Sequence, residues 1–554
     1  MKKVHSIFLT LFIVLPTVLS AQVEKQVEVT KAYIPSVEPA TKIAIEPDRV
    51  DTVQMRPDID YSITPLSLTT NLVTRPIRPA TVTYWEFNRP LPFYVKAGVG
   101  YPFNSVFDFY ASSQNRSTGY VVGYLNHEGQ FAKIKNNFGD KNNSTRMLNR
   151  IGAAAGKYLG NHLLEGGLSF ENRLYHRYGW SAEADPDAAG AKVNYSDVHI
   201  DLRVGDDFTD LSRLNFNVEF HGIYFLDHSS APEDSDPARQ LNVGVSLALA
   251  RQFGRHTLLL KGGFDRMSGE KAISDYSNNI FSVGLRYGYK SSVVDAEAGV
   301  DYLRDNIKAE ESANHVIPFA KLRLNLGVKG LTPYFELDGQ LQDNSFRSLS
   351  RRNPYLPMGL YLPKNTTFHN LRLGVDGRNS SESIVYRLYA GLSIRRNQVY
   401  WAVQDQQFVA WQARQTVTSI NGEIEYKPIS RLELMLGLHG NFYDDDTQLY
   451  NGLPSFEGVI KAQYKARTVA FGLSATMQSE RKWTVIHTTK LDATPPEIYN
   501  VPFTVDLRAN VDWYVNSRFT VFVEARNLAN QRLYALPFFP DYGINFTAGI
   551  KANF

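Results

Sequence analysis

Cysteine is absent from the 554 residues, so the chain has no disulfide and no cysteine that could carry the lipid of a lipoprotein. Beyond the first residues no run of eighteen apolar residues occurs, which excludes a membrane protein built from hydrophobic helices. The formal net charge is only +3, so the basic footprint of a nucleic-acid-binding protein is missing. Stability must therefore come from hydrogen bonding and packing, and nucleic acid is not expected as a partner.

The short motifs of common enzymes are also missing. No Gly-x-Ser-x-Gly, His-Glu-x-x-His, phosphate-binding loop or zinc-ligand spacing occurs. Acidic residues and histidines do alternate with apolar ones at His199, Asp201, Glu219 and His221, a mixture that favours a solvated surface over a catalytic centre. We therefore predict no catalytic residues, no cofactor and no metal site, and the protein is not expected to be an enzyme.

The first 21 residues have the pattern of a secretion signal. Lys2 and Lys3 precede an apolar stretch at 7–15, and small residues at Ser20 and Ala21 end it. The apolar stretch is too short to cross a bilayer as a helix. Residues 1–21 are predicted to be a signal peptide, and the mature protein is predicted to leave the cytoplasm.

Residues 22–90 contain no glycine and are broken by proline. Proline removes a backbone donor and disfavours long helices and central strands, so an extended periplasmic arm is expected. Within it Val27, Val29 and Tyr33 alternate with polar residues, a pattern that would let this piece add as a strand to a partner's sheet. An ordinary flexible arm is the plainer alternative.

From residue 91 onward apolar and polar residues alternate. The last three runs, at 503–513, 519–526 and 544–554, show the alternation clearly, and the chain ends on the aromatic Phe554. Period-two alternation indicates a strand with one apolar and one polar face. A soluble sandwich would give the same pattern in one strand, but its repetition along the chain and the terminal aromatic favour a bacterial outer-membrane barrel.

About 22 such runs occur, including those at 319–328, 384–394 and 417–426. The connections alternate between short and long, with 342–365 and 395–415 among the long ones, while 100–105 is an exception. Short turns at one rim and long loops at the other are typical of outer-membrane barrels. The predicted fold is all-β: a single transmembrane antiparallel β-barrel of about 22 strands over 91–554, preceded by the proline-rich arm.

The alternation also predicts which side chains face outward. Leu214, Phe216, Val218 and Phe220 would face lipid, and the polar residues between them would face the lumen. A barrel of this size has a lumen wide enough to require filling. The arm, an inward-folded loop such as 342–365, or a partner protein could narrow it.

The 342–365 loop is a candidate ligand-binding segment. Its cationic and aromatic residues, which suit an anionic or sugar ligand through charge and stacking, are Arg347, Arg351, Arg352, Tyr355 and Tyr361. The alternative is a solvated rim with no ligand.

The end of the chain resembles the TonB-dependent receptors. In that family a strand runs into Asn-Leu-x-Asn and a tyrosine and then into a final strand that closes on phenylalanine, as Val521, the Asn527–Asn530 motif, Tyr534 and Phe554 do here. The resemblance extends over 91–554 and implies an outer-membrane barrel of the transporter class. The style of the arm is similar to Bacteroidota members. Family members carry a plug of well over a hundred residues, whereas 22–90 supplies only 69, so a full plug is not expected.

Two functions remain open. The first is solute uptake or channel function in the bacterial outer membrane, with a reduced or absent plug and a TonB-type energy transducer as possible partner. The second is a non-transporting barrel that serves as a platform for other outer-membrane proteins or lipoproteins in export, assembly or surface lipoprotein handling. A hydrolase barrel is a third, remote reading. Outer-membrane lipid is the expected surrounding in each case.

Overall fold

The computed structural model describes residues 91–554 except 114–117, 182, 184–189, 230–235, 309–310, 328–329, 446–449 and 487–495. The predicted signal peptide, the arm and its segment with Val27, Val29 and Tyr33 lie outside the described residues. None of the described helices is long and apolar enough to cross a membrane.

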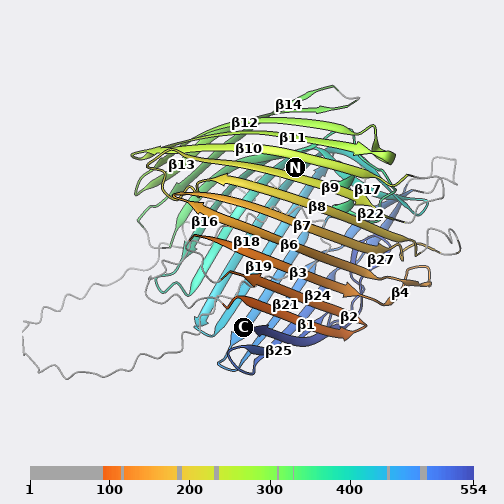
Figure 1. The fold of residues 1–554 in the computed structure, drawn as a ribbon. Helices are drawn as coiled ribbons and strands as arrows, with labels where there is room; N and C mark the ends of the chain where they lie inside the picture. Colours follow the sequence, from red (N-terminus) through yellow and green to blue (C-terminus); the bar gives the residue numbers. More distant parts are fainter. Residues whose placement is uncertain are drawn as a thin grey trace, which may run out of the picture. The chain divides into compact units, whose positions relative to one another are not determined.

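The described chain forms a closed antiparallel barrel of 22 strands, as predicted (Figure 1). Neighbours in the chain are neighbours in the wall, because each strand pairs with the next one that belongs to the barrel. The wall strands are β1 (Phe93–Tyr101), β2 (Asn104–Ser112), β3 (Gly119–Gln130), β6 (Arg146–Leu159), β7 (His162–His176), β8 (Lys192–Gly205), β9 (Asn215–Asp227), β10 (Arg239–Phe253), β11 (His256–Glu270), β12 (Ser277–Lys290), β13 (Val294–Ile307), β14 (Ala313–Leu324), β15 (Thr332–Gln342), β16 (Thr366–Arg378), β17 (Ile384–Gln404), β18 (Gln407–Ile429), β19 (Leu432–Asp445), β20 (Phe456–Lys465), β21 (Val469–Gln478), β24 (Thr504–Tyr514), β25 (Phe519–Arg526) and β28 (Asn545–Asn553).

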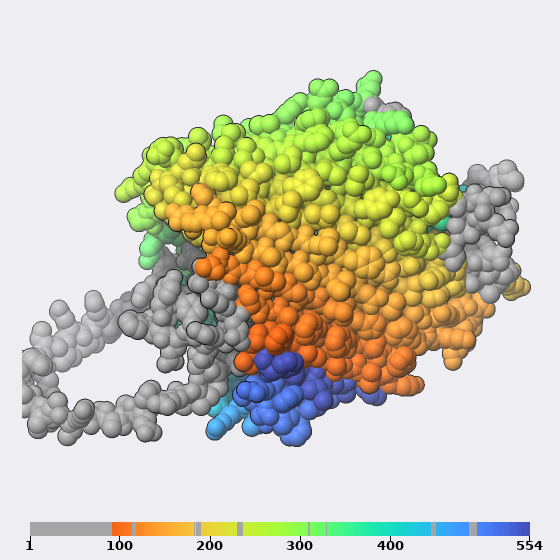
Figure 2. All heavy atoms as spheres, viewed as in Figure 1, coloured from red at the N-terminus to blue at the C-terminus, as the bar shows by residue number. Residues whose placement is uncertain are grey.

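The last strand closes the wall on the first. Strand β28 pairs antiparallel with β1, and Val95 lies opposite Ala552 in this pair. The backbone N–H of Phe93 donates to the carbonyl of Phe554 at 2.9 Å, and Phe554 returns the bond at 3.0 Å. No strand of the wall is left with an unpaired edge, which is how a barrel satisfies its backbone polar groups. Figure 2 shows the outer surface, with the blue C-terminal part beside the orange first strands.

The two faces of the wall follow the alternation. Leu214 and Phe220 are exposed on the outside, whereas Asn215 is fully buried. Inward-facing charges pair on the lumen side across one intervening strand: Lys96 of β1 reaches Glu524 of β25 at 2.8 Å, and Lys551 of β28 reaches Asp512 of β24 at 2.6 Å. The outside is thus apolar and the lumen side charged and polar.

Short turns gather at one end of the barrel, called here the turn end, and longer connections at the other, the loop end. Gly160 and Gly254 have φ of +64° and +62° in two of the turns, a conformation that costs glycine little. Strands β1 and β28 meet at the turn end through Phe93 and Phe554. Strand β7 therefore runs from the turn end at His162 to the loop end at His176, and β8 runs back.

Some predicted bounds were wrong. Strand β14 ends at Leu324, not at 328, because Gly327 takes a positive φ in the turn that follows. The 395–415 segment is not a loop, since β17 and β18 continue through most of it.

Several long connections also contain short elements. These are β4 (Lys133–Lys135), β5 (Lys141–Asn143), η1 (Lys271–Ile273), α2 (Phe346–Arg352), β22 (Arg481–Ile486), β23 (Glu497–Val501), β26 (Tyr534–Leu536) and β27 (Phe539–Pro540).

Candidate functional site

At the loop end of the barrel, connections and strand ends share a cluster of buried apolar side chains, named here the mouth cluster. The cluster joins connections that leave the wall far apart with residues of the wall strands themselves. These connections are the ones that follow β7, β9, β11, β15, β21 and β25. Its buried members are Tyr178, Trp180, Val193, Tyr195, Phe225, Ala238, Met267, Ile273, Tyr276, Ile280, Phe346, Leu349, Leu356, Leu362, Val399, Trp401, Val403, Phe408, Val485, Leu536 and Phe539.

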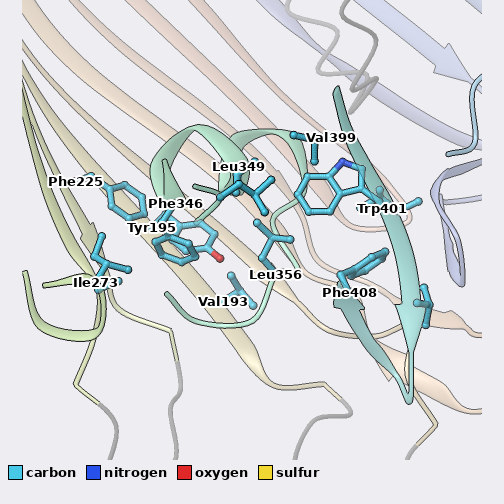
Figure 3. Close-up of a cluster of buried hydrophobic side chains, with 14 of the residues drawn as sticks. Val193, Tyr195, Phe225, Ile273, Phe346, Leu349, Leu356, Val399, Trp401 and Phe408 are labelled. Atoms are coloured by element: carbon cyan, nitrogen blue, oxygen red, sulfur yellow. The ribbon is translucent and has the colours of Figure 1, made fainter. Parts of the chain in front are cut away.

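The connection between β15 and β16 places helix α2 within this cluster (Figure 3). Ser345 caps the helix, because its side-chain oxygen accepts a hydrogen bond from the backbone N–H of Ser348 at 3.3 Å. Phe346 and Leu349 lie on one face and are fully buried. Phe346 packs edge-on against the rings of Tyr195 and Phe225 of the wall.

The opposite face of α2 carries arginines four residues apart. Arg347 donates to Asp197 of β8 at 2.8 Å. Arg351 donates to Asp197 at 2.6 Å and to Glu171 of β7 at 2.7 Å. Asp197 is fully buried. The loop that starts at β15 is thus ion-paired to β7 and β8, several strands away along the wall.

The arginines of α2 have different electrostatic surroundings. Burial disfavours the charge of Arg351, yet the carboxylates of Asp197 and Glu171 raise its pKa above the ordinary value. Burial lowers the pKa of Arg352 to about 10, because only Asp343 opposes the effect. Arg352 donates to the side chain of Asn344 at 2.6 Å instead of to a carboxylate.

Aromatic rings from three connections and from strand β18 meet around Phe539. Tyr355 stacks on it with ring centroids 3.9 Å apart, and Trp180 meets it edge-on at 4.9 Å. Phe408 lies at 5.9 Å and Tyr178 at 5.2 Å. The hydroxyl of Tyr178 also donates to the carbonyl of Pro540 at 2.8 Å. These contacts join loops from opposite parts of the wall.

The β17–β18 hairpin extends past its neighbouring wall strands at the loop end. Its pairing shifts between Arg395 and Gln398, and the turn residues Asp405 and Gln406 both have positive φ, as in a type I′ turn. The upper part of β17 pairs in parallel with β22, with Val403 opposite Val485. The hairpin and β22 thus pair beyond the wall and contribute Val399, Trp401, Val403, Phe408 and Val485 to the mouth cluster.

A pocket of about 430 Å³ lies below α2 against the wall. It is lined by Tyr124, Arg150, Ser169, Phe170, Glu171, His199, Arg347 and Arg351. Ser169 lies opposite His199, two residues nearer the turn end than the pair Glu171 and Asp197. The pocket is therefore on the lumen side of the mouth cluster.

The predicted ligand-binding residues are not all in this pocket. Arg347 and Arg351 line it, while Arg352 does not. Tyr355 is packed against Phe539, and the ring of Tyr361 lies 5.1 Å from that of Tyr276. A role of these five residues in ligand binding stays a prediction.

The sequence analysis missed the wall residues that the arginines contact. Glu171 and Arg173 share the inward face of β7 by the period of two, and Asp197 lies directly opposite Glu171 on β8. The period of two was available as a signal for their orientation. Nothing in the sequence pairs these strands with the loop that follows β15.

No protein-family model matches the sequence, and no curated protein matches it. Solved structures do match the fold. The FrpB iron transporter from Neisseria meningitidis has a TM-score of 0.65 at 10% identity, over 84% of this chain and 82% of that one. The siderophore receptor PirA from Acinetobacter baumannii gives 0.65 at 10%, over 83% and 80%.

The copper transporter OprC gives a TM-score of 0.60 at 12% identity, over 85% of this chain and 81% of that one. At such identities the likeness concerns the fold. This chain has the barrel fold of outer-membrane metal and siderophore receptors.

Proposed function

We propose that this protein is an outer-membrane barrel for solute uptake or channel function, and that the mouth cluster is the gate that closes its lumen at rest. The observation that carries the proposal is that connections from around the wall meet at the loop end, with buried rings at their meeting point. A lumen of 22 strands needs such a closure if the membrane is to remain a barrier.

An outer-membrane location is supported by the apolar outer face. Exposed side chains at mid-strand include Leu168, Ile200 and Leu202, and exposed aromatics near the turn end include Tyr287 and Trp513. A lipid-facing apolar band flanked by aromatic residues is typical of outer-membrane barrels. The structural neighbours named above are transporters and receptors, which favours transport over an enzymatic role.

The N-terminal part of the proposal rests on the sequence alone. We propose that 1–21 is a signal peptide and that 22–90 takes the place of a full plug, as in a Bacteroidota-type relative of the TonB-dependent receptors. Val27, Val29 and Tyr33 would bind a TonB-type transducer or another envelope protein. Binding of a 22–40 peptide to the transducer's C-terminal domain, lost on replacing these three residues by serine, would support it.

A disulfide across the gate tests its movement. A Cβ on Gly359 would lie 3.3 Å from the Cβ of Ala272, slightly closer than the spacing of about 3.5–4.5 Å in disulfides. The pair Ala272→Cys and Gly359→Cys would tie the β15–β16 loop to η1 in a chain that has no other cysteine. The φ of +74° at Gly359 would cost cysteine roughly 1–2 kcal/mol.

Conductance in planar bilayers is the measurement. We expect the oxidised double variant to show no openings, and reduction to restore those of the wild type. The single variant Ala272→Cys is the control and should not respond to oxidant. Large, steady conductance of the oxidised protein would contradict the gate. A silent wild type that co-purifies with other outer-membrane proteins in fixed ratio would favour the platform function instead.

A further inference from the structure

The pocket below α2 carries more positive than negative charge. Arg150 donates to Glu171 at 2.6 Å, and Arg173 lies 3.3 Å from Glu171 and 3.4 Å from Asp197. With Arg347 and Arg351, four guanidiniums therefore face two carboxylates, and two positive charges remain in excess. Buried charges are normally balanced, because an unbalanced one pays the full cost of desolvation.

The guanidiniums also keep donors available. Arg347 uses its Nε for Asp197, and Arg150 uses its Nε for Glu171. Their terminal nitrogens have no hydrogen-bond partner within the described part of the chain. The side chains of Arg150 and Arg347 are only 34% and 14% exposed, and both line the pocket.

The remaining wall of the pocket offers neutral polar groups. Tyr124, Ser169 and His199 line it on the side toward the turn end. The ring of Tyr124 lies across Gly152, where a Cβ would come within 2.6 Å of the Tyr124 hydroxyl. A side chain at position 152 would displace this ring, so the glycine is part of how the pocket is built.

We propose that this pocket binds a small organic molecule that carries a phosphate monoester group, and that it does so from the lumen side. Arg150 and Arg347 would hold the phosphate, whose charge of about −2 matches the excess in the cluster. Arginine suits this role because its planar fork gives two parallel hydrogen bonds to an oxyanion. Tyr124, Ser169 and His199 would contact hydroxyl groups of the molecule's body.

The volume supports an organic phosphate over a bare ion. A space of about 430 Å³ is within the usual range of small-molecule sites, roughly 300–1,000 Å³. The assignment does not depend on the gate proposed above, because binding is an equilibrium property of the closed protein.

Calorimetric titration of the detergent-solubilised full chain with glycerol 3-phosphate tests the site. We expect saturable binding of one equivalent and no binding of uncharged glycerol. Arg150→Gln on β6 and Arg347→Gln on α2 should each weaken binding at least tenfold. Arg352→Gln is the matched control, since Arg352 is on the same helix but outside the pocket, and its affinity should stay within twofold of the wild type.

Variants on two different elements, β6 and α2, distinguish the loss of a ligand site from a loosening of the gate. Arg347→Gln removes a contact that holds α2, whereas Arg150→Gln leaves the bonds of α2 to Asp197 in place. Loss of binding in both variants supports the site. Absence of saturable binding, unchanged binding in Arg150→Gln, or equal loss in Arg352→Gln would overturn the proposal. None of these results depends on whether the protein conducts.

Discussion

The wall and the mouth cluster are stabilised in different ways. The wall is a continuous ladder of backbone hydrogen bonds that closes on itself between β1 and β28. The mouth cluster is held by side chains from separate connections, which pack around the ring of Phe539. Helix α2 is also ion-paired to Asp197 of the wall. Opening the wall would break a row of backbone bonds, whereas opening the mouth requires mainly that side chains separate, together with the short backbone pairing of β17 with β22. The mouth is therefore the part suited to move.

Because of this difference, mutations in the wall and mutations in the mouth cluster should have separate effects. A substitution in the mouth cluster should raise local opening and leave the barrel intact, because structure of low local stability opens independently of the rest. A substitution on the outer face of the wall should destabilise the barrel and leave the mouth closed. Trypsin cleavage after Arg351 and Arg352 reports mouth opening. Migration in gel electrophoresis before and after heating reports whether the barrel is folded.

The largest effect on the mouth is expected for Phe539→Ala. Phe539 is buried and contacts the rings of Tyr178, Trp180 and Tyr355. Truncating a buried phenylalanine costs about 3–5 kcal/mol. If that cost falls on the closed mouth, cleavage should rise on the order of 10²–10⁴-fold, while heat-dependent migration is unchanged. A barrel that unfolds at lower temperature in this variant would show that mouth and wall are one cooperative unit.

The opposite result is expected for Leu168→Arg. Leu168 lies at the middle of β7 with its side chain outside the barrel. A lipid-facing arginine at mid-membrane costs about 2–4 kcal/mol. The folded barrel should become less stable in urea, by that amount, with no change in the cleavage rate at Arg351. Leu168→Ala is the control and should have a small effect. Faster cleavage in Leu168→Arg would contradict independent behaviour.

The difference between the wall and the mouth cluster also explains which parts of the fold the sequence predicts. Alternation along each strand follows from one side chain facing lipid and the next the lumen, so strands such as β9 and the closing strand β28 could be placed from sequence. The mouth cluster has no such period. The pairing of Arg347 with Asp197 joins segments 150 residues apart, and only the path of the folded loop decides it.

The β17–β18 hairpin shows a second reason. Val399 and Trp401 have strand-forming side chains, but neighbours on both faces are buried there, so apolar and polar residues do not alternate. The sequence therefore predicts a long polar or aromatic connection at 395–415, where the structure has two strands. Loss of the period-two alternation marks the point at which the hairpin leaves the wall. A prediction based on strand propensity would have extended both strands through this segment.

A smaller effect is expected for Asp197→Asn, which tests the ionic part of the mouth. The amide keeps one acceptor oxygen but removes the charge that Arg347 and Arg351 share. Hydrogen bonds to charged groups contribute about 1.5–3 kcal/mol, so cleavage should rise on the order of 10–100-fold. Asp201→Asn, four residues nearer the turn end on the same strand, is the matched control. Equal cleavage in the two variants would mean that α2 is held by its apolar face alone.

The smallest effect is expected for Tyr178→Phe, which removes a single hydrogen bond and keeps the ring. The hydroxyl donates to the carbonyl of Pro540, and burial raises the pKa of Tyr178 well above its ordinary value, so it remains a donor throughout the physiological range. One neutral hydrogen bond contributes about 0.5–1.5 kcal/mol, which predicts a rise in cleavage of roughly two- to tenfold. Tyr178→Ala should approach the effect of Phe539→Ala, because it removes the ring as well. If Tyr178→Phe equalled Tyr178→Ala, the hydroxyl and not ring packing would hold these loops together, and the distinction between a backbone-bonded wall and a ring-packed mouth would fail at this point.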